Sequence, residues 1–148
     1  MLRTRVPHGA FVLVSDGAKA LLLCNRGDGA HLDLSVVDQR QEDHPRTSEQ
    51  GTDRPGRTHS SVGPGRSGYE QTDWHRMDED RFLQAVLSRL DGLVGEDGAP
   101  GLVVVAPARA LGELRKHYST RLSRALLAEV EKDLTNHPVS EIERLISG

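Results

Sequence analysis

The amino-acid sequence predicts one α/β domain in which helices pack on the faces of a mixed β-sheet. Three observations support this prediction. The N-terminal part contains two short apolar runs and one alternating segment, which are typical of strands. The second half alternates segments of helical spacing with a short apolar run. A chain of 148 residues can also bury a core without disulfide or metal support. Strands followed by alternating helices and strands are typical of layered α/β architectures. We therefore predict a single domain over residues 1–148.

Composition excludes several classes of protein. The chain has 19 basic and 22 acidic side chains, and its formal charge of −3 argues against a bulk polyanion binder. A single cysteine, Cys24, excludes an intramolecular disulfide framework and a multi-cysteine zinc site, and it favours a reducing compartment. No apolar run approaches the ~18 residues of a membrane span, and the N-terminus lacks the features of a secretory signal. We therefore expect a cytoplasmic protein without a membrane span.

The N-terminal part predicts a three-stranded antiparallel meander. Residues 10–14 form an apolar run that ends at Ser15-Asp16-Gly17, and residues 20–24 form a second run. The glycine-rich residues 25–29 then suit a hairpin connection. Residues 32–37 alternate apolar and polar side chains, which is the period of a half-exposed strand. Because the links between these strands are short, we expect them to pair in antiparallel fashion.

Composition changes sharply after the meander. Residues 41–73 contain only two sizeable apolar side chains, Val62 and Tyr69, among several prolines and glycines. We predict a long, irregular and flexible loop, because a segment without apolar anchors gains little from packing. Within it, Gly63-Pro64-Gly65-Arg66-Ser67-Gly68 matches G-x-G-x-x-G, but no strand precedes the motif and no apolar helix follows it. We therefore expect no dinucleotide site and no cofactor.

The second half begins with a helix and a strand. Apolar residues at helical spacing predict a helix from Trp74 to Val94, with Thr72 or Asp73 as its N-cap. Residues 102–105 form a short, branched apolar run, which is typical of a strand buried on both faces.

The C-terminal part leaves one choice open. Pro107 starts a further helix, whose apolar side continues to Tyr118. Residues 126–130 fit either a continuation of this helix or a fifth strand, and their periodicity does not decide between the two. The last amphipathic helix follows Pro138, where Ser140 and Glu143 stand at capping-box spacing.

This element order suggests a ribonuclease H-like fold, whose nucleases hold two cations with carboxylates from several elements. Asp16 suits the first strand, and Glu79 or Asp80 suits the first helix. The fourth strand, however, ends Val105-Ala106-Pro107 and offers no acid. A metal-dependent hydrolase is therefore our weakest hypothesis, with no catalytic or metal-ligating residue assigned. We interpret Asp16 as a turn former before Gly17.

Basic side chains gather in the loop and in residues 109–124, where five of them stand against one acid, Glu113. Such density suits contact with phosphates or with an acidic partner, and it also suits a solvated helix face. The candidate binding residues are Arg54, Arg57, Arg66, Arg109, Arg115, Lys116, Arg121 and Arg124.

Several segments stand in one order along nearly the whole chain: Val14-Ser15-Asp16-Gly17-Ala18-Lys19-Ala20, Thr52-Asp53-Arg54-Pro55-Gly56-Arg57, Gly65-Arg66-Ser67, Asp80-Arg81-Phe82, Val104-Val105-Ala106-Pro107-Ala108-Arg109 with Leu111-Gly112-Glu113-Leu114-Arg115, and Glu131-Lys132-Asp133-Leu134-Thr135. Together they resemble the bacterial host attachment protein family, described as required for attachment to host cells. That family is similar in fold to the middle domain of archaeal and eukaryotic peptide-chain release factors, a ribonuclease H-like architecture. The resemblance implies that residues 126–130 form a strand, which makes a five-stranded mixed sheet.

The same resemblance implies a function. It describes a non-enzymatic cytoplasmic interaction protein implicated in host attachment, and we expect residues 54–66 and 109–124 to meet a protein or RNA partner. The identity of that partner and the oligomeric state stay open. The alternative is a translation-associated factor that touches ribosomal or transfer RNA. Release factors act through a Gly-Gly-Gln tip, which this sequence lacks, so peptidyl-tRNA hydrolysis is not carried over.

Overall fold

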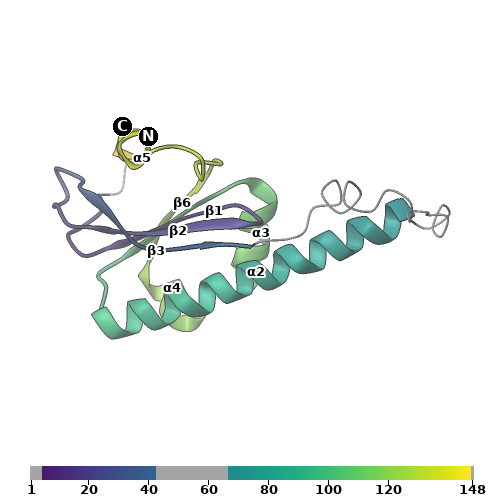
Figure 1. Cartoon of the computed structure of the whole chain (residues 1–148). Helices are drawn as coiled ribbons and strands as arrows, with labels where there is room; N and C mark the ends of the chain where they lie inside the picture. The colour runs from purple at the N-terminus through teal and green to yellow at the C-terminus, as the bar shows by residue number, and fades with distance from the viewer. Residues whose placement is uncertain (1–4, 43–66, 148) are drawn as a thin grey trace.

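The computed structural model describes residues 5–42 and 67–147, with the side chains of residues 67–76 and 97 left out. Five strands form one open sheet in the order β3-β2-β1-β5-β6 (Figure 1). The strands are β1 (Phe11–Ser15), β2 (Lys19–Asn25), β3 (Leu34–Gln41), β5 (Leu102–Ala106) and β6 (Leu126–Glu131). The helices are α2 (Ser67–Asp97), α3 (Ala108–Arg115), α4 (Thr120–Ala125) and α5 (Val139–Ser147).

The sheet is mixed, as predicted. The first three strands form an antiparallel meander, whereas β1 pairs with β5, and β5 with β6, in parallel. Residues 126–130 are therefore part of a strand, which decides the choice that periodicity left open. The predicted five-stranded α/β architecture is confirmed.

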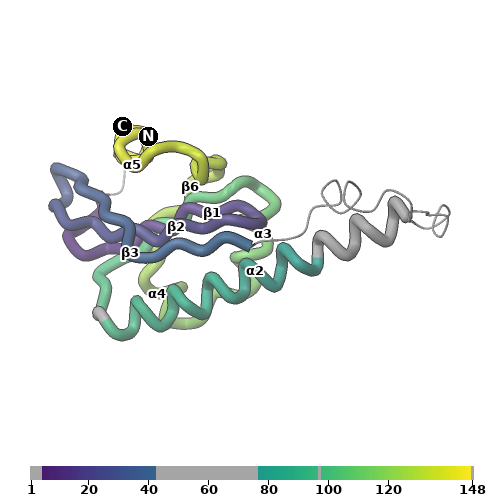
Figure 2. The backbone as a smooth tube through the Cα atoms, viewed as in Figure 1, coloured from purple at the N-terminus to yellow at the C-terminus, as the bar shows by residue number. Residues whose placement is uncertain are grey.

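Alternation along the strands divides the core between two faces of the sheet. From β1, Phe11 and Leu13 point to the face covered by α2, α3 and α4, and Val12 and Val14 point to the face covered by α5 (Figures 1 and 2). All five residues of β5 are buried, as the continuous apolar run predicts for a strand with a layer on each side. Among the described residues, no helix combines the length and apolar character that a membrane crossing requires.

Three predicted boundaries are wrong. β3 begins at Leu34 and not at Leu32, because the preceding residues belong to the turn that follows β2. α2 begins at Ser67 and not at Trp74, so residues 67–73 of the predicted loop are helical and the proposed N-cap lies inside the helix. A long helix propagates cheaply beyond its apolar stripe, which periodicity does not detect. Gln41, the first residue of the predicted loop, belongs to β3, and residues 43–66 lie outside the described residues, as does most of the G-x-G-x-x-G match.

The third wrong boundary lies after Pro107, where one predicted helix is two. α3 ends before Tyr118, and Ser119 caps α4 by accepting a hydrogen bond of 3.0 Å from the Leu122 N–H. The predicted capping box in α5 is also wrong. Ser140 lies inside the first turn, and the Glu143 carboxylate instead accepts a hydrogen bond of 2.6 Å from the Leu34 N–H.

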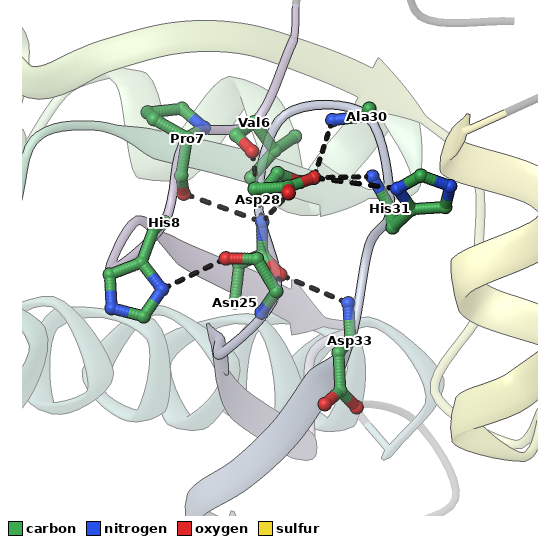
Figure 3. A network of polar contacts seen from close by, with 9 residues as sticks. Val6, Pro7, His8, Asn25, Asp28, Ala30, His31 and Asp33 are labelled. Atoms are coloured by element: carbon green, nitrogen blue, oxygen red, sulfur yellow. Dashed lines mark hydrogen bonds and ion pairs between the residues drawn. The ribbon is translucent and has the colours of Figure 1, made fainter.

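Asn25 organises the connection between β2 and β3, and it is fully buried (Figure 3). Its Nδ2 donates to the Val6 carbonyl at 2.9 Å and to the Asp28 carbonyl at 3.3 Å. Its Oδ1 accepts from the N–H groups of Gly27 at 2.9 Å and Asp33 at 3.0 Å. The sequence places this residue only in a turn, whereas its side chain ties the N-terminal segment to both sides of that turn.

Candidate functional site

The carboxyl ends of β1, β5 and β6 meet at one edge of the sheet, because these strands are parallel. Asp16 follows β1, Pro107 precedes α3 after β5, and residues 132–135 follow β6. In open α/β sheets the segments that follow parallel strands commonly form the functional site. We call this region, together with Glu79 and Asp80 of α2, the carboxyl edge.

Asp16 forms the turn between β1 and β2, as predicted, and also holds the segment after β6. Its Oδ1 accepts hydrogen bonds from the N–H groups of Ala18 at 2.8 Å and Lys19 at 2.7 Å. The hydroxyl of Thr135, a buried residue, lies 3.1 Å from the Asp16 Oδ2 and 2.9 Å from the Asp133 Oδ1. Asp16 therefore joins two segments that are far apart in the sequence.

Arg109, at the start of α3, lies beside two acids of α2. Its Nη1 donates to the Glu79 Oε1, and its Nη2 lies 3.7 Å from the Asp80 Oδ1. That Asp80 oxygen is buried and has no hydrogen-bond partner among the described residues. Glu79 also packs against the turn after β1, since a Cβ at Gly17 would lie 2.8 Å from the Glu79 Cδ. This glycine is needed for the close approach of the turn to α2.

The carboxyl edge does not supply the ligands of a two-cation site. Asp16 accepts hydrogen bonds from backbone N–H groups, and Glu79 is paired with Arg109. Within residues 5–42 and 67–147, no three histidine, cysteine or acidic side chains are arranged to hold a metal ion. The geometry of the described residues therefore gives the hydrolase hypothesis no support.

The predicted basic residues occupy three different places. Arg109 lies at the carboxyl edge, Arg115 and Lys116 lie at the end of α3, and Arg121 and Arg124 lie on α4. The loop residues of the same prediction, Arg54, Arg57 and Arg66, fall outside the described residues.

Several of these cations have acidic partners within the chain. The Arg115 Nη2 lies 2.8 Å from the Glu129 Oε1, and the Lys116 Nζ lies 3.3 Å from the Glu113 Oε1. Arg121 contacts Asp91 twice, because its Nη1 donates to the Asp91 backbone carbonyl at 3.1 Å and lies 3.8 Å from the Asp91 Oδ1. For Arg124, the part of the chain that the structure describes offers no ion pair or hydrogen bond. Amino-acid composition counts all these cations alike, so only their surroundings distinguish them.

Glu129 of β6 receives two donors, from Arg115 and from the Tyr118 hydroxyl, which lies 2.8 Å from its Oε2. Burial raises the pKa of Tyr118 far above its ordinary value, and the bond to Glu129 adds to this effect. Burial would also raise the pKa of Glu129, but hydrogen bonds from Arg115 and Tyr118 outweigh it and lower that pKa. The cluster therefore holds a carboxylate and a neutral phenol at neutral pH, and it fastens α3 to the sheet edge.

Sequence reasoning missed two features of this region. The bond between Thr135 and Asp16 joins residues 119 positions apart. Gly17 is required because a Cβ there would collide with Glu79 of α2, a helix that is distant in the sequence. Thr135 and Gly17 both lie in segments quoted for the family resemblance, which was the only signal that could have indicated them.

Comparisons with known proteins give two findings. The sequence profile of bacterial archaeo-eukaryotic release factor family 12 matches residues 9–146. The fold is similar to a crystal structure of the archaeal translation termination factor aRF1, with a TM-score of 0.52 and 16% sequence identity. That likeness covers 93% of this chain but only 35% of the termination factor, so this chain spans about a third of its length. No curated protein matches the sequence.

These findings correct the functional prediction. The family that matches nearly the whole chain is a release factor family, and the similar structure is that of a termination factor. The release-factor-like part of the predicted resemblance is confirmed. The prediction of a host attachment protein is wrong, and the findings favour the translation-associated alternative.

Proposed function

Because the chain belongs to family 12 of the bacterial archaeo-eukaryotic release factors, we propose that it is a translation-associated factor that binds ribosomal or transfer RNA. The family match, from residue 9 to residue 146, is the observation that carries this proposal. The fold supports the same proposal, because the structure that it resembles is that of a translation termination factor.

The exposed arginines provide the chemistry for contact with RNA. The side chains of Arg115 and Arg121 are 57% and 56% exposed, although each lies near an acid. An exposed ion pair contributes only about 0–1 kcal/mol, so an RNA phosphate can compete for the same guanidinium. Arginine also matches phosphate geometry with two parallel hydrogen bonds. The overall charge of −3 means that such contact depends on local surfaces and not on the whole molecule.

The proposal concerns binding and includes no hydrolytic step. The sequence has no Gly-Gly-Gln tripeptide, the segment through which release factors act. At the carboxyl edge, Asp16 and Glu79 are engaged by protein donors and serve the packing of the turn after β1. We therefore assign no catalytic residue.

Sedimentation with purified bacterial ribosomes tests the proposal. The full chain should pellet with 70S ribosomes at low salt and bind unfractionated tRNA in a fluorescence anisotropy titration. The logarithm of the binding constant should fall linearly with the logarithm of salt concentration, by roughly 0.7 to 0.9 for each phosphate contacted. A chain that stays in the supernatant and does not bind tRNA at low salt contradicts the proposal.

The opposite face of the sheet offers a matched control. Arg144 lies on α5, is 75% exposed, and is 3.8 Å from Glu141. The Arg144→Gln variant removes one positive charge, as a variant on α4 would, but far from α3 and α4 (Figure 1). We expect this variant to bind RNA like the unaltered protein.

A further inference from the structure

An open hollow of about 410 Å³ lies between the C-terminal end of α2 and helix α4. It is lined by Arg121 and Arg124 and by uncharged residues, most of them glycine or alanine, which include Gly95 and Gly98. None of the described lining residues is acidic. The hollow is thus an accessible surface that has two arginines on its α4 side and two glycines, Gly95 and Gly98, on its α2 side.

The structure holds one of the two guanidinium groups in place. Arg121 donates to the Asp91 carbonyl at 3.1 Å, and its Nη1 lies 3.8 Å from the Asp91 Oδ1. Its guanidinium also lies directly over the backbone of α2, because a Cβ at Gly95 would be only 2.1 Å from the Nη1. The carbonyl and carboxylate of Asp91 therefore engage part of the Arg121 charge and fix its position. Most of its five N–H donors are still available for a ligand.

The positive charge of Arg124 has no partner among the described residues. Arg124 stands one helical turn from Arg121 on α4, and it has neither an ion pair nor a hydrogen bond among the described residues. A guanidinium without an intramolecular partner binds an anion without first breaking another contact. This distinguishes Arg124 from Arg109, Arg115 and Lys116, whose charges are engaged by acids.

We infer that this hollow binds a phosphate group of ribosomal or transfer RNA, an inference that rests on the proposed function. Arg124 supplies the principal contact, Arg121 supplies a second one from its fixed position, and Gly95 leaves the space in which Arg121 lies. Two guanidinium groups near one site suit the oxygens of a phosphate diester, which accept forked hydrogen bonds. The absence of acidic lining among the described residues fits an anionic ligand.

Two variants of the full chain test the hollow, with tRNA anisotropy and ribosome sedimentation as readouts. Arg124→Gln should weaken tRNA binding about tenfold, the value of one charge-assisted hydrogen bond, and reduce the salt slope by roughly 0.7 to 0.9. Gly95→Ala keeps every charge but displaces the Arg121 guanidinium, and should weaken binding about threefold. Alanine favours a helix over glycine, and Arg124 has no partner to lose, so circular dichroism should show both variants folded.

Arg144→Gln on α5 is again the matched control, because it removes one exposed positive charge outside the hollow. An equal loss in Arg144→Gln and Arg124→Gln shows dependence on charge alone and overturns the inference. So does an Arg124→Gln variant that binds tRNA like the unaltered protein, although the proposed function then stands. If the unaltered chain binds neither ribosomes nor tRNA, the proposed function itself fails. Binding of a polyglutamate peptide as tight as that of tRNA overturns the assignment to RNA.

Discussion

Replacing Asn25 with alanine should destabilise the protein by about 3 kcal/mol. The variant removes the donor to the buried Val6 carbonyl, which lies 2.9 Å away, and an unsatisfied buried group costs about 1–3 kcal/mol. It also leaves the N–H groups of Gly27 and Asp33 without their acceptor. These groups are only partly buried, so water replaces part of each bond and the loss is about 0.5 kcal/mol for each.

Urea denaturation followed by circular dichroism measures this loss, and a thermal scan should show a melting temperature about 6–12 °C lower. Gln39→Ala is the control, because this exposed residue lies on the same hairpin and should change stability by less than about 0.5 kcal/mol. Asn25→Asp keeps the Oδ1 acceptor but places a carboxylate oxygen against the Val6 carbonyl. Burial raises the folded-state pKa of such a group, so this variant should lose stability as pH rises from 4 to 7. An Asn25→Ala variant as stable as Gln39→Ala would refute the assigned role.

Two further predictions concern the carboxyl edge and α3. Thr135→Val keeps the shape of the side chain but removes the hydroxyl donor that Asp16 and Asp133 share, so it should cost about 1 kcal/mol in urea denaturation, with Thr135→Ser retaining most of the stability. Burial acts to raise the pKa of Glu113, but hydrogen bonds from His117 and Lys116 outweigh it and lower that pKa below 4.5. A carboxyl group with a lowered folded-state pKa adds stability above pH 4.5, and this stability is lost when the pH falls. Glu113→Gln lacks the carboxyl group, so on acidification below pH 4.5 it should lose less stability than the unaltered protein. Parallel acid-denaturation curves for the two proteins would contradict this assignment.

The elements that could be predicted are those whose pattern is local. β5 is a continuous apolar run because both of its faces are buried, and the continuous apolar runs of β1 and β2 have the same cause. The start of α2 at Ser67 escaped prediction because the first turns of that helix have no apolar stripe. No residue of β6 is fully buried, and its short pattern suits a helix equally well.

The family resemblance indicated the fold correctly and the function wrongly. Segments such as Lys132-Asp133-Leu134-Thr135 lie at the carboxyl edge, where they shape packing and turns. Residues that preserve a fold identify structural kinship, but they carry little information about the partner that binds elsewhere on the surface.

The sequence by itself determined the alternation of apolar runs, the number of charges and the absence of a Gly-Gly-Gln tip. Only the tertiary structure decided which charges are neutralised. Arg109 meets Glu79 across 30 positions, and Arg115 meets Glu129 across 14, whereas Arg124 is left without such a partner among the described residues. The physical reason is that periodicity reports burial along one element, while the energy of a charge depends on distances between elements. Those distances follow from the order and direction of the strands, which bring distant segments together.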